Sequence, residues 1–146
     1  MDELIEQMKV ALASTFAFYL KAHNFHWNVE GPNFSQYHSF FEGIYTDAFG
    51  AVDGIAEHIR TLRSYAPGSF ARYSQLSLIA DEVNVPSAMA MVTKLADDNQ
   101  VIIDHLTKVQ KLAEAQNKTG LANYLQDRID IHEKHGWMLR ATGARK

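Results

Sequence analysis

Four long helix-forming stretches constrain the fold of this chain more than any other feature. The 146-residue sequence holds only three prolines, Pro32, Pro67 and Pro86, and each lies between two stretches or at the start of one. Because a proline inside a helix removes a hydrogen bond and clashes with the preceding turn, these positions mark where helices end or begin. The pattern predicts helices over Asp2–Asn28, Asn33–Leu62, Pro86–Asn117 and Thr119–Thr142.

The connections between the predicted helices are unequal in length. Residues 29–32 and residue 118 form tight connections, whereas about twenty residues separate the second helix from the third. Within this long crossover, Arg72–Ile79 has the composition of a short helix. Two tight connections and one long crossover predict an all-α fold, a ferritin-like four-helix bundle with a short extra helix between helices 2 and 3. We expect one domain over residues 1–146.

Composition and charge exclude several classes of protein. The chain has no cysteine, which removes disulfides, thiolate metal sites and thiol nucleophiles, so any bound metal must be held by His, Asp or Glu. A formal net charge of −3 argues against a surface-wide electrostatic grip on nucleic acid. The acidic start MDELIEQMKV is unlike a secretion signal, and no apolar run approaches the ~18–20 residues of a membrane span, so we expect a cytoplasmic protein.

The second predicted helix carries ligand-type side chains on one face. At about 100° per residue, His38, Glu42, Asp53 and Glu57 fall within an arc of about 100°. These four residues are either metal ligands or a solvated acidic face that includes one histidine. A separate arc predicts the core stripe of this helix, made of Phe34, Phe41, Ile44, Tyr45, Ala48, Val52, Ile55 and Ile59.

The distance along this helix decides how such ligands can meet. His38 and Asp53 are fifteen residues apart, about 22 Å of helix, so one helix cannot bring both to one metal ion. Two copies packed antiparallel about a two-fold axis would place the His38 end of one beside the Asp53 and Glu57 end of the other. The pattern therefore predicts a metal site shared between subunits.

Three glycines, Gly43, Gly50 and Gly54, form a stripe beside the ligand face. A glycine inside a helix costs ~0.5–1 kcal/mol relative to alanine, so three of them need a reason. We interpret the stripe as the close approach of another backbone. The alternative is chance occurrence in an exposed helix.

His26 lies near the end of the first predicted helix, on an arc shared with Met8, Leu12, Phe16 and Tyr19. The turn at residues 30–32 folds the second helix back, so His26 and His38 should lie near each other at one end of a hairpin. Nitrogen and oxygen ligands without sulfur suit iron, and zinc or manganese less exclusively. The alternative is a helix end with one buried, satisfied histidine.

The remaining histidines give weaker indications. An iron site inside one bundle needs Glu-x-x-His pairs, and the sequence has none. His132 and His135 stand three apart, whereas the zinc-protease motif needs four. His23 is either an auxiliary residue of the site or a surface residue. We interpret His132 as structural, on a stripe with Leu121, Leu125 and Leu139.

Several motifs resemble those of the Dps family, the DNA-protection-during-starvation proteins or miniferritins. They are Asn24–Asn28 (NFHWN), Gly31–Phe34 with His38, the Asp53-x-x-x-Glu57 pair and His132–Leu139 (HEKHGWML). The resemblance covers nearly the whole chain. It implies a ferroxidase centre formed by His26 and His38 of one subunit with Asp53 and Glu57 of a two-fold partner.

The same resemblance implies an activity and an assembly. We expect a hollow homo-dodecamer that oxidises Fe²⁺ with hydrogen peroxide or dioxygen, stores ferric mineral and so protects DNA from oxidative damage. Glu42 matches the position of a supporting acidic metal ligand. Trp27 matches an aromatic residue near the centre, which either donates electrons to stray radicals or simply packs. Zinc is expected to substitute for iron at the site.

Two departures from the family pattern bear on DNA and on iron entry. The lysine-rich tail of DNA-coating relatives is missing from the start of this chain, and basic residues gather only in residues 140–146, so DNA binding is expected to be weak and salt-sensitive. Asn123 replaces one pore aspartate of relatives, which leaves Asp127 and Asp130 as candidates. The alternative function is a DNA-binding or structural shell protein without significant ferroxidase activity.

Overall fold

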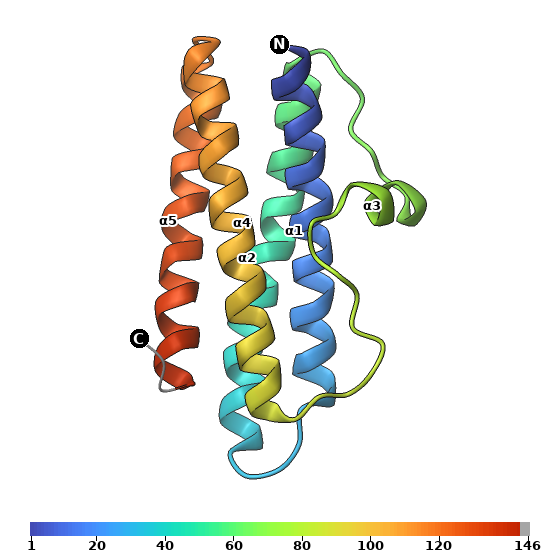
Figure 1. Cartoon of the computed structure of the whole chain (residues 1–146), viewed down its shortest axis with the longest axis vertical. Coiled ribbons are helices and arrows are strands. Elements are labelled where there is room, and N and C mark those ends of the chain that lie inside the picture. Colours follow the sequence, from blue (N-terminus) through green and yellow to red (C-terminus); the bar gives the residue numbers. More distant parts are fainter. Residues whose placement is uncertain (144–146) are drawn as a thin grey trace.

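Four long helices pack along one another, and a short helix lies in the crossover between the second and third of them (Figure 1). The computed structural model describes residues 1–143, and no strand occurs in that range. The helices are α1 (Asp2–Asn28), α2 (Phe34–Thr61), α3 (Phe70–Leu76), α4 (Ala88–Ala115) and α5 (Thr119–Thr142). The all-α bundle with one long crossover is confirmed.

The helix ends follow local capping chemistry. Predicted and observed bounds agree for α1 and α5 and differ by one residue at each end of α2. α4 begins at Ala88 because the Ser87 hydroxyl accepts the Ala90 amide at 3.2 Å. α3 begins earlier than predicted because Ser69 caps it in the same way, and it ends before the extended Ser77.

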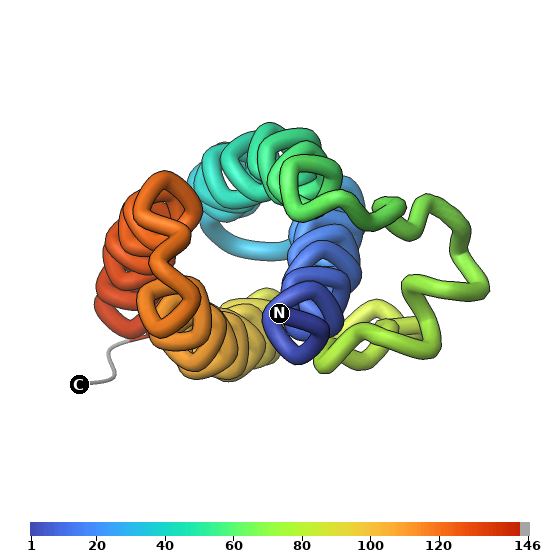
Figure 2. Tube along the Cα trace, turned by 90° about the horizontal axis from the view of Figure 1, so that it is seen from above, coloured from blue at the N-terminus to red at the C-terminus, as the bar shows by residue number. Residues whose placement is uncertain are grey.

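The core lies between two helical hairpins, α1 with α2 and α4 with α5, and α1 also packs against α4 (Figure 2). α3 and the crossover lie outside the bundle, against α1. The largest buried side chains include Phe18 and Phe25 of α1, Phe41 of α2 and Met91 of α4. Each of the four long helices therefore buries one apolar stripe, which is the main source of stability in such bundles.

The predicted core stripe of α2 is correct in its middle and wrong at its start. Phe41, Ile44, Ala48, Ile55 and Ile59 are buried, whereas Tyr45 and Val52 are only half-buried. Phe34 is 42% exposed, because it is the first residue of α2, beside the turn, where it stacks on the His38 ring. Ala51, which the stripe left out, is buried.

The glycine stripe of α2 has a different explanation at Gly54 from the one its pattern indicated. A Cβ atom added there would lie 2.6 Å from the hydroxyl oxygen of Tyr124 on α5, which donates to the Ala51 carbonyl. Gly54 therefore makes room for a side chain of its own subunit. Gly43 and Gly50 meet nothing within 4 Å in this chain.

The crossover is attached to α1 and α4 by polar contacts. The buried Lys21 ammonium donates to the Ala80 carbonyl at 3.0 Å and pairs with Asp98 on α4 at 2.8 Å. Lys94 pairs with Glu82 of the crossover at 3.0 Å.

None of the helices within residues 1–143 is long and apolar enough to cross a membrane.

Candidate metal centre

His26 and His38 are brought together by the turn between α1 and α2. Gly31 and Asn33 adopt positive φ angles of 98° and 66°, which lets the chain reverse within a few residues. Nδ1 of His26 lies 2.7 Å from the carbonyl oxygen of His38, and Nδ1 of His38 lies 2.7 Å from that of His26. The two rings stack with centroids 3.7 Å apart.

This reciprocal pairing fixes the tautomer of both rings. A carbonyl oxygen only accepts, so each Nδ1 carries a proton, and in the neutral ring each Nε2 keeps a free lone pair. In metal-binding histidines, the ring nitrogen that does not bind the metal usually donates a hydrogen bond, often to a backbone carbonyl. The His26 carbonyl is one of the last four of α1, which lack partners within the helix, and His38 supplies its hydrogen bond. Both imidazoles are thus oriented before any metal arrives.

Glu42 lies beside this pair, one turn of α2 after His38. Its carboxylate oxygen is 3.9 Å from Nε2 of His26, and its side chain is largely exposed. Within residues 1–143, no three His, Cys, Asp or Glu side chains are arranged to hold a metal ion. The chain alone therefore offers two oriented nitrogens and one adjacent carboxylate.

Asp53 and Glu57 lie on the same helix but far from the histidines. Both are exposed on α2, and the fifteen residues between His38 and Asp53 correspond to about 22 Å of helix. The structure of one chain does not bring them to His26 and His38. A site that contains all four side chains therefore needs a second chain.

Aromatic side chains surround the histidine pair on the α1 side. The His23 ring stacks on Tyr45 at a centroid distance of 3.8 Å and contacts the Trp27 ring, tilted by 31°, at 3.9 Å. The Tyr19 hydroxyl lies 3.0 Å from Nδ1 of His23. His23 is thus half-buried, and burial together with the nearby His26 lowers its pKa. Trp27 is 57% exposed, so one face of this cluster borders solvent.

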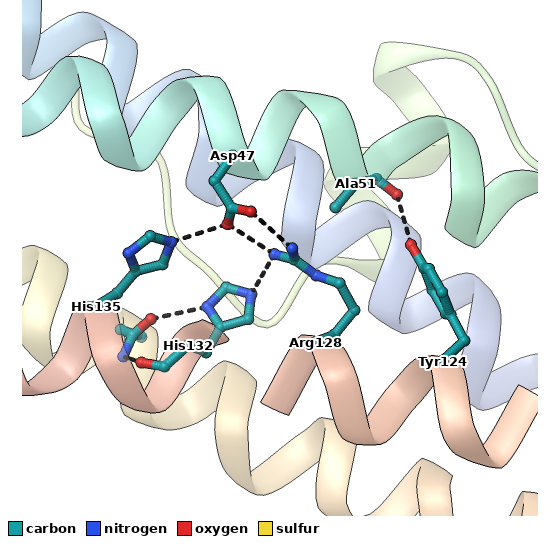
Figure 3. A network of polar contacts seen from close by, with 7 residues as sticks. Asp47, Ala51, Tyr124, Arg128, His132 and His135 are labelled. Atoms are coloured by element: carbon teal, nitrogen blue, oxygen red, sulfur yellow. Dashed lines mark hydrogen bonds and ion pairs between the residues drawn. The ribbon is translucent and has the colours of Figure 1, made fainter. Parts of the chain in front are cut away.

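A second polar group crosses the bundle between α2 and α5 (Figure 3). Arg128 forms a two-pronged ion pair with Asp47, with nitrogen–oxygen distances of 2.9 and 3.0 Å. Nε2 of His135 lies 2.8 Å from the same carboxylate. Although burial alone would raise the pKa of Asp47, the hydrogen bonds from His135 and Arg128 hold it well below its usual range.

His132 completes this group and has no exposed surface. Its Nε2 accepts from Arg128 at 3.0 Å and its Nδ1 donates to the Asn99 side chain at 2.8 Å. Burial, followed by the charge of Arg128, lowers the pKa of His132 to about 3, so the ring stays neutral. The interpretation of His132 as structural is confirmed.

Asp47 and Arg128 were not predicted from the sequence, although a signal for Arg128 was present. Arg128 lies on the stripe of α5 that also contains Leu125 and His132, and a charged residue on a buried stripe needs a partner. No spacing along the chain identifies that partner, because Asp47 is 81 residues away.

The remaining predicted positions lie on the surface or beyond the described part of the chain. Asn123, Asp127 and Asp130 are exposed on α5, so their assignment to an iron-entry pore stays a prediction. Of the basic segment 140–146, residues 144–146 lie outside the described residues.

Comparison with known proteins identifies the family of this fold. The family described as "Ferritin-like domain" matches residues 5–144. A DNA protection during starvation protein of Brevibacillus brevis is 34% identical, with 89% of this chain and 87% of the relative covered. The crystal structure of a Dps protein from Bacillus brevis superposes with a TM-score of 0.93 at 30% identity, covering 97% of this chain and 95% of that one.

A third match places the fold in a wider class. A Dps structure from Vibrio cholerae O1, described as a member of a broad superfamily of ferritin-like diiron-carboxylate proteins, has a TM-score of 0.92 at 28% identity. The superposition covers 96% of this chain and 88% of the Vibrio cholerae chain. The fold and the family match thus define a ferritin-like protein. Within that class, the chain belongs to the Dps family.

Proposed function

We propose that this chain is a ferroxidase and iron-storage protein of the cytoplasm. It oxidises Fe²⁺ with hydrogen peroxide or dioxygen at sites shared between subunits and stores the ferric product inside a hollow dodecamer. Removing Fe²⁺ and peroxide together protects DNA from oxidative damage, which agrees with the name of the Brevibacillus brevis relative.

One observation carries this proposal: the reciprocal hydrogen bonds between His26 and His38. They leave two Nε2 lone pairs free at one end of the α1–α2 hairpin. Neutral imidazole is a good ligand for Fe²⁺ and for Zn²⁺. The sequence has no cysteine, so thiolate, the softer ligand for such metals, is not available. We expect zinc to compete with iron for this position.

The carboxylates of the site come from a second subunit in this proposal. Asp53 and Glu57 are exposed on α2, so an antiparallel copy of the hairpin can approach them. Carboxylates favour the harder Fe³⁺ ion, so they stabilise the product more than the substrate. Two adjacent Fe²⁺ ions supply both electrons that one peroxide needs, which avoids release of the hydroxyl radical.

The test is anaerobic addition of Fe²⁺ to the purified protein, followed by a stoichiometric pulse of hydrogen peroxide. We expect rapid oxidation at about one peroxide per two irons, followed by ultraviolet absorbance, in a large shell whose size is measured alongside. A double variant with His26→Ala and Asp53→Asn should lose this reaction and keep the assembly, because both substitutions remove ligands.

The matched control replaces an exposed aspartate elsewhere. Asp104→Asn on α4 removes the same charge as Asp53→Asn and should leave the oxidation rate unchanged. If the His26→Ala, Asp53→Asn variant oxidises iron as fast as the parent protein, the site assignment is wrong. If the parent protein is no faster than buffer, the chain forms a shell with another purpose, and DNA retention becomes the measurement to make.

A further inference from the structure

The crossover ends, just before α4, in a segment without any buried side chain, residues 80–85, here called the strap (Figure 1). Ile79, which precedes the strap, is buried, and the Ser87 hydroxyl, which follows it, caps α4. Within the strap, Val83 is 89% exposed. The two ends of the strap are therefore fixed by burial and by capping, whereas the strap itself depends on polar contacts.

Three polar contacts attach the strap to the bundle, two from α1 and one from α4. The Lys21 ammonium donates to the Ala80 carbonyl at 3.0 Å. The Asn24 side chain donates to the Glu82 carbonyl at 3.3 Å. The Lys94 ammonium pairs with the Glu82 carboxylate at 3.0 Å. Because two of these contacts use backbone carbonyls, α1 holds the path of the strap rather than its side chains.

Lys21 is the central member of this arrangement, because it also pairs with Asp98 on α4 at 2.8 Å. The side chain of Lys21 is 9% exposed and that of Asp98 is 18% exposed. Removing one charge of a buried pair is costly, since the other charge stays buried without a partner. Lys21 lines a cavity of about 400 Å³ between α1 and the strap, so the nearest water for its ammonium lies on the strap side.

The charged groups around Asp98 come from all three segments. Burial raises the pKa of Asp98 above its ordinary value of 3.8, and the neighbouring charge of Asp97 adds to this. The ammonium groups of Lys21 and Lys94 oppose the rise. In the strap, the hydrogen bond from Lys94 lowers the pKa of Glu82. Asp98 thus takes up a proton more readily than an ordinary aspartate, and Glu82 less readily than an ordinary glutamate.

We propose that the Lys21–Asp98 pair is a latch and that protonation of Asp98 in acid releases the strap from α1. The carboxylate takes a proton from solvent and becomes a neutral acid. Lys21 keeps its charge, turns towards water and gives up the Ala80 carbonyl. The strap then lifts between its fixed ends, which opens the cavity beneath it to solvent. This inference does not rest on the proposed ferroxidase function.

The experiment follows digestion of the purified protein by a glutamate-specific protease between pH 7 and pH 4.5, with fragments assigned by mass. The rate of cleavage after Glu82 is divided by that of an unfolded peptide of the same sequence at the same pH, which removes the pH dependence of the protease. We expect this ratio to rise on acidification by about tenfold, because cleavage reports the open population. Asp98→Asn imitates the protonated side chain, so its ratio should already be high at pH 7 and should not rise further.

Two further variants make the test decisive. Asp104→Asn removes a charge from an exposed position of α4 and should behave as the parent protein. Lys21→Met removes the ammonium that drives the release, so its ratio should be the same at pH 7 and pH 4.5, which also serves where Asp98→Asn does not fold.

Three outcomes contradict the latch. In the first, Asp98→Asn has the same ratio as the parent protein at pH 7. In the second, the rise on acidification persists in Asp98→Asn or in Lys21→Met. In the third, cleavage after Glu133 of α5 rises in step with cleavage after Glu82, which would mean that acid loosens the whole bundle.

Discussion

At the scale of single residues, His132 is expected to make the folded protein acid-sensitive. Its pKa is about 3 in the folded state against an ordinary value of 6.5, so below pH 6.5 only the unfolded chain takes up a proton there. Stability should therefore fall as the pH drops from 6.5 towards 3, by up to about 1.4 kcal/mol per pH unit from this group. The pKa of Asp47 is lowered in the folded state, so this group adds a further loss of stability only when the pH falls below about 3.8, its ordinary pKa.

The variant His132→Gln isolates this contribution, because glutamine keeps a donor and an acceptor but does not titrate. We expect it to be less stable than the parent at neutral pH and to show a flatter dependence between pH 6.5 and 4. Urea unfolding at one fixed protein concentration measures both, since assembly makes stability concentration-dependent. If the free energy of unfolding falls with pH equally in parent and variant, the acid sensitivity comes from other groups.

At the scale of helices, Gly54 and Gly50 should respond oppositely to alanine. At Gly50 the new Cβ meets nothing within its own chain, so each subunit gains ~0.5–1 kcal/mol of helix propensity. At Gly54 it lies 2.6 Å from the Tyr124 hydroxyl, so the Tyr124 side chain or α5 must shift, at a cost of about 1–3 kcal/mol. Thermal unfolding compares the two, and Tyr124→Phe should partly rescue Gly54→Ala. Equal stability of the two alanine variants would show that the Tyr124 side chain moves aside without a measurable cost.

Helices were predictable from the sequence to the extent that local chemistry determines them. Prolines and turn residues give the ends of α1 and α5, and the turn at 30–32 predicts that His26 and His38 lie together. Contacts between helices were not predictable, because spacing along one helix does not tell which faces of two helices meet. The pairing of Asp47 with Arg128 and the reason for Gly54 both belong to the α2–α5 contact.

At the scale of the whole molecule, the sharing of sites between subunits can be tested by complementation. One chain carries His26→Ala and His38→Ala, and the other carries Asp53→Asn and Glu57→Gln. Neither variant chain forms a complete site on its own. In a mixed two-fold pair, the histidines of the second chain meet the carboxylates of the first, so one of the two sites is complete. Random co-assembly in equal amounts should therefore restore about a quarter of the parent's peroxide-dependent iron oxidation. If the four residues acted within one chain, mixing would restore nothing, because neither chain holds a complete set.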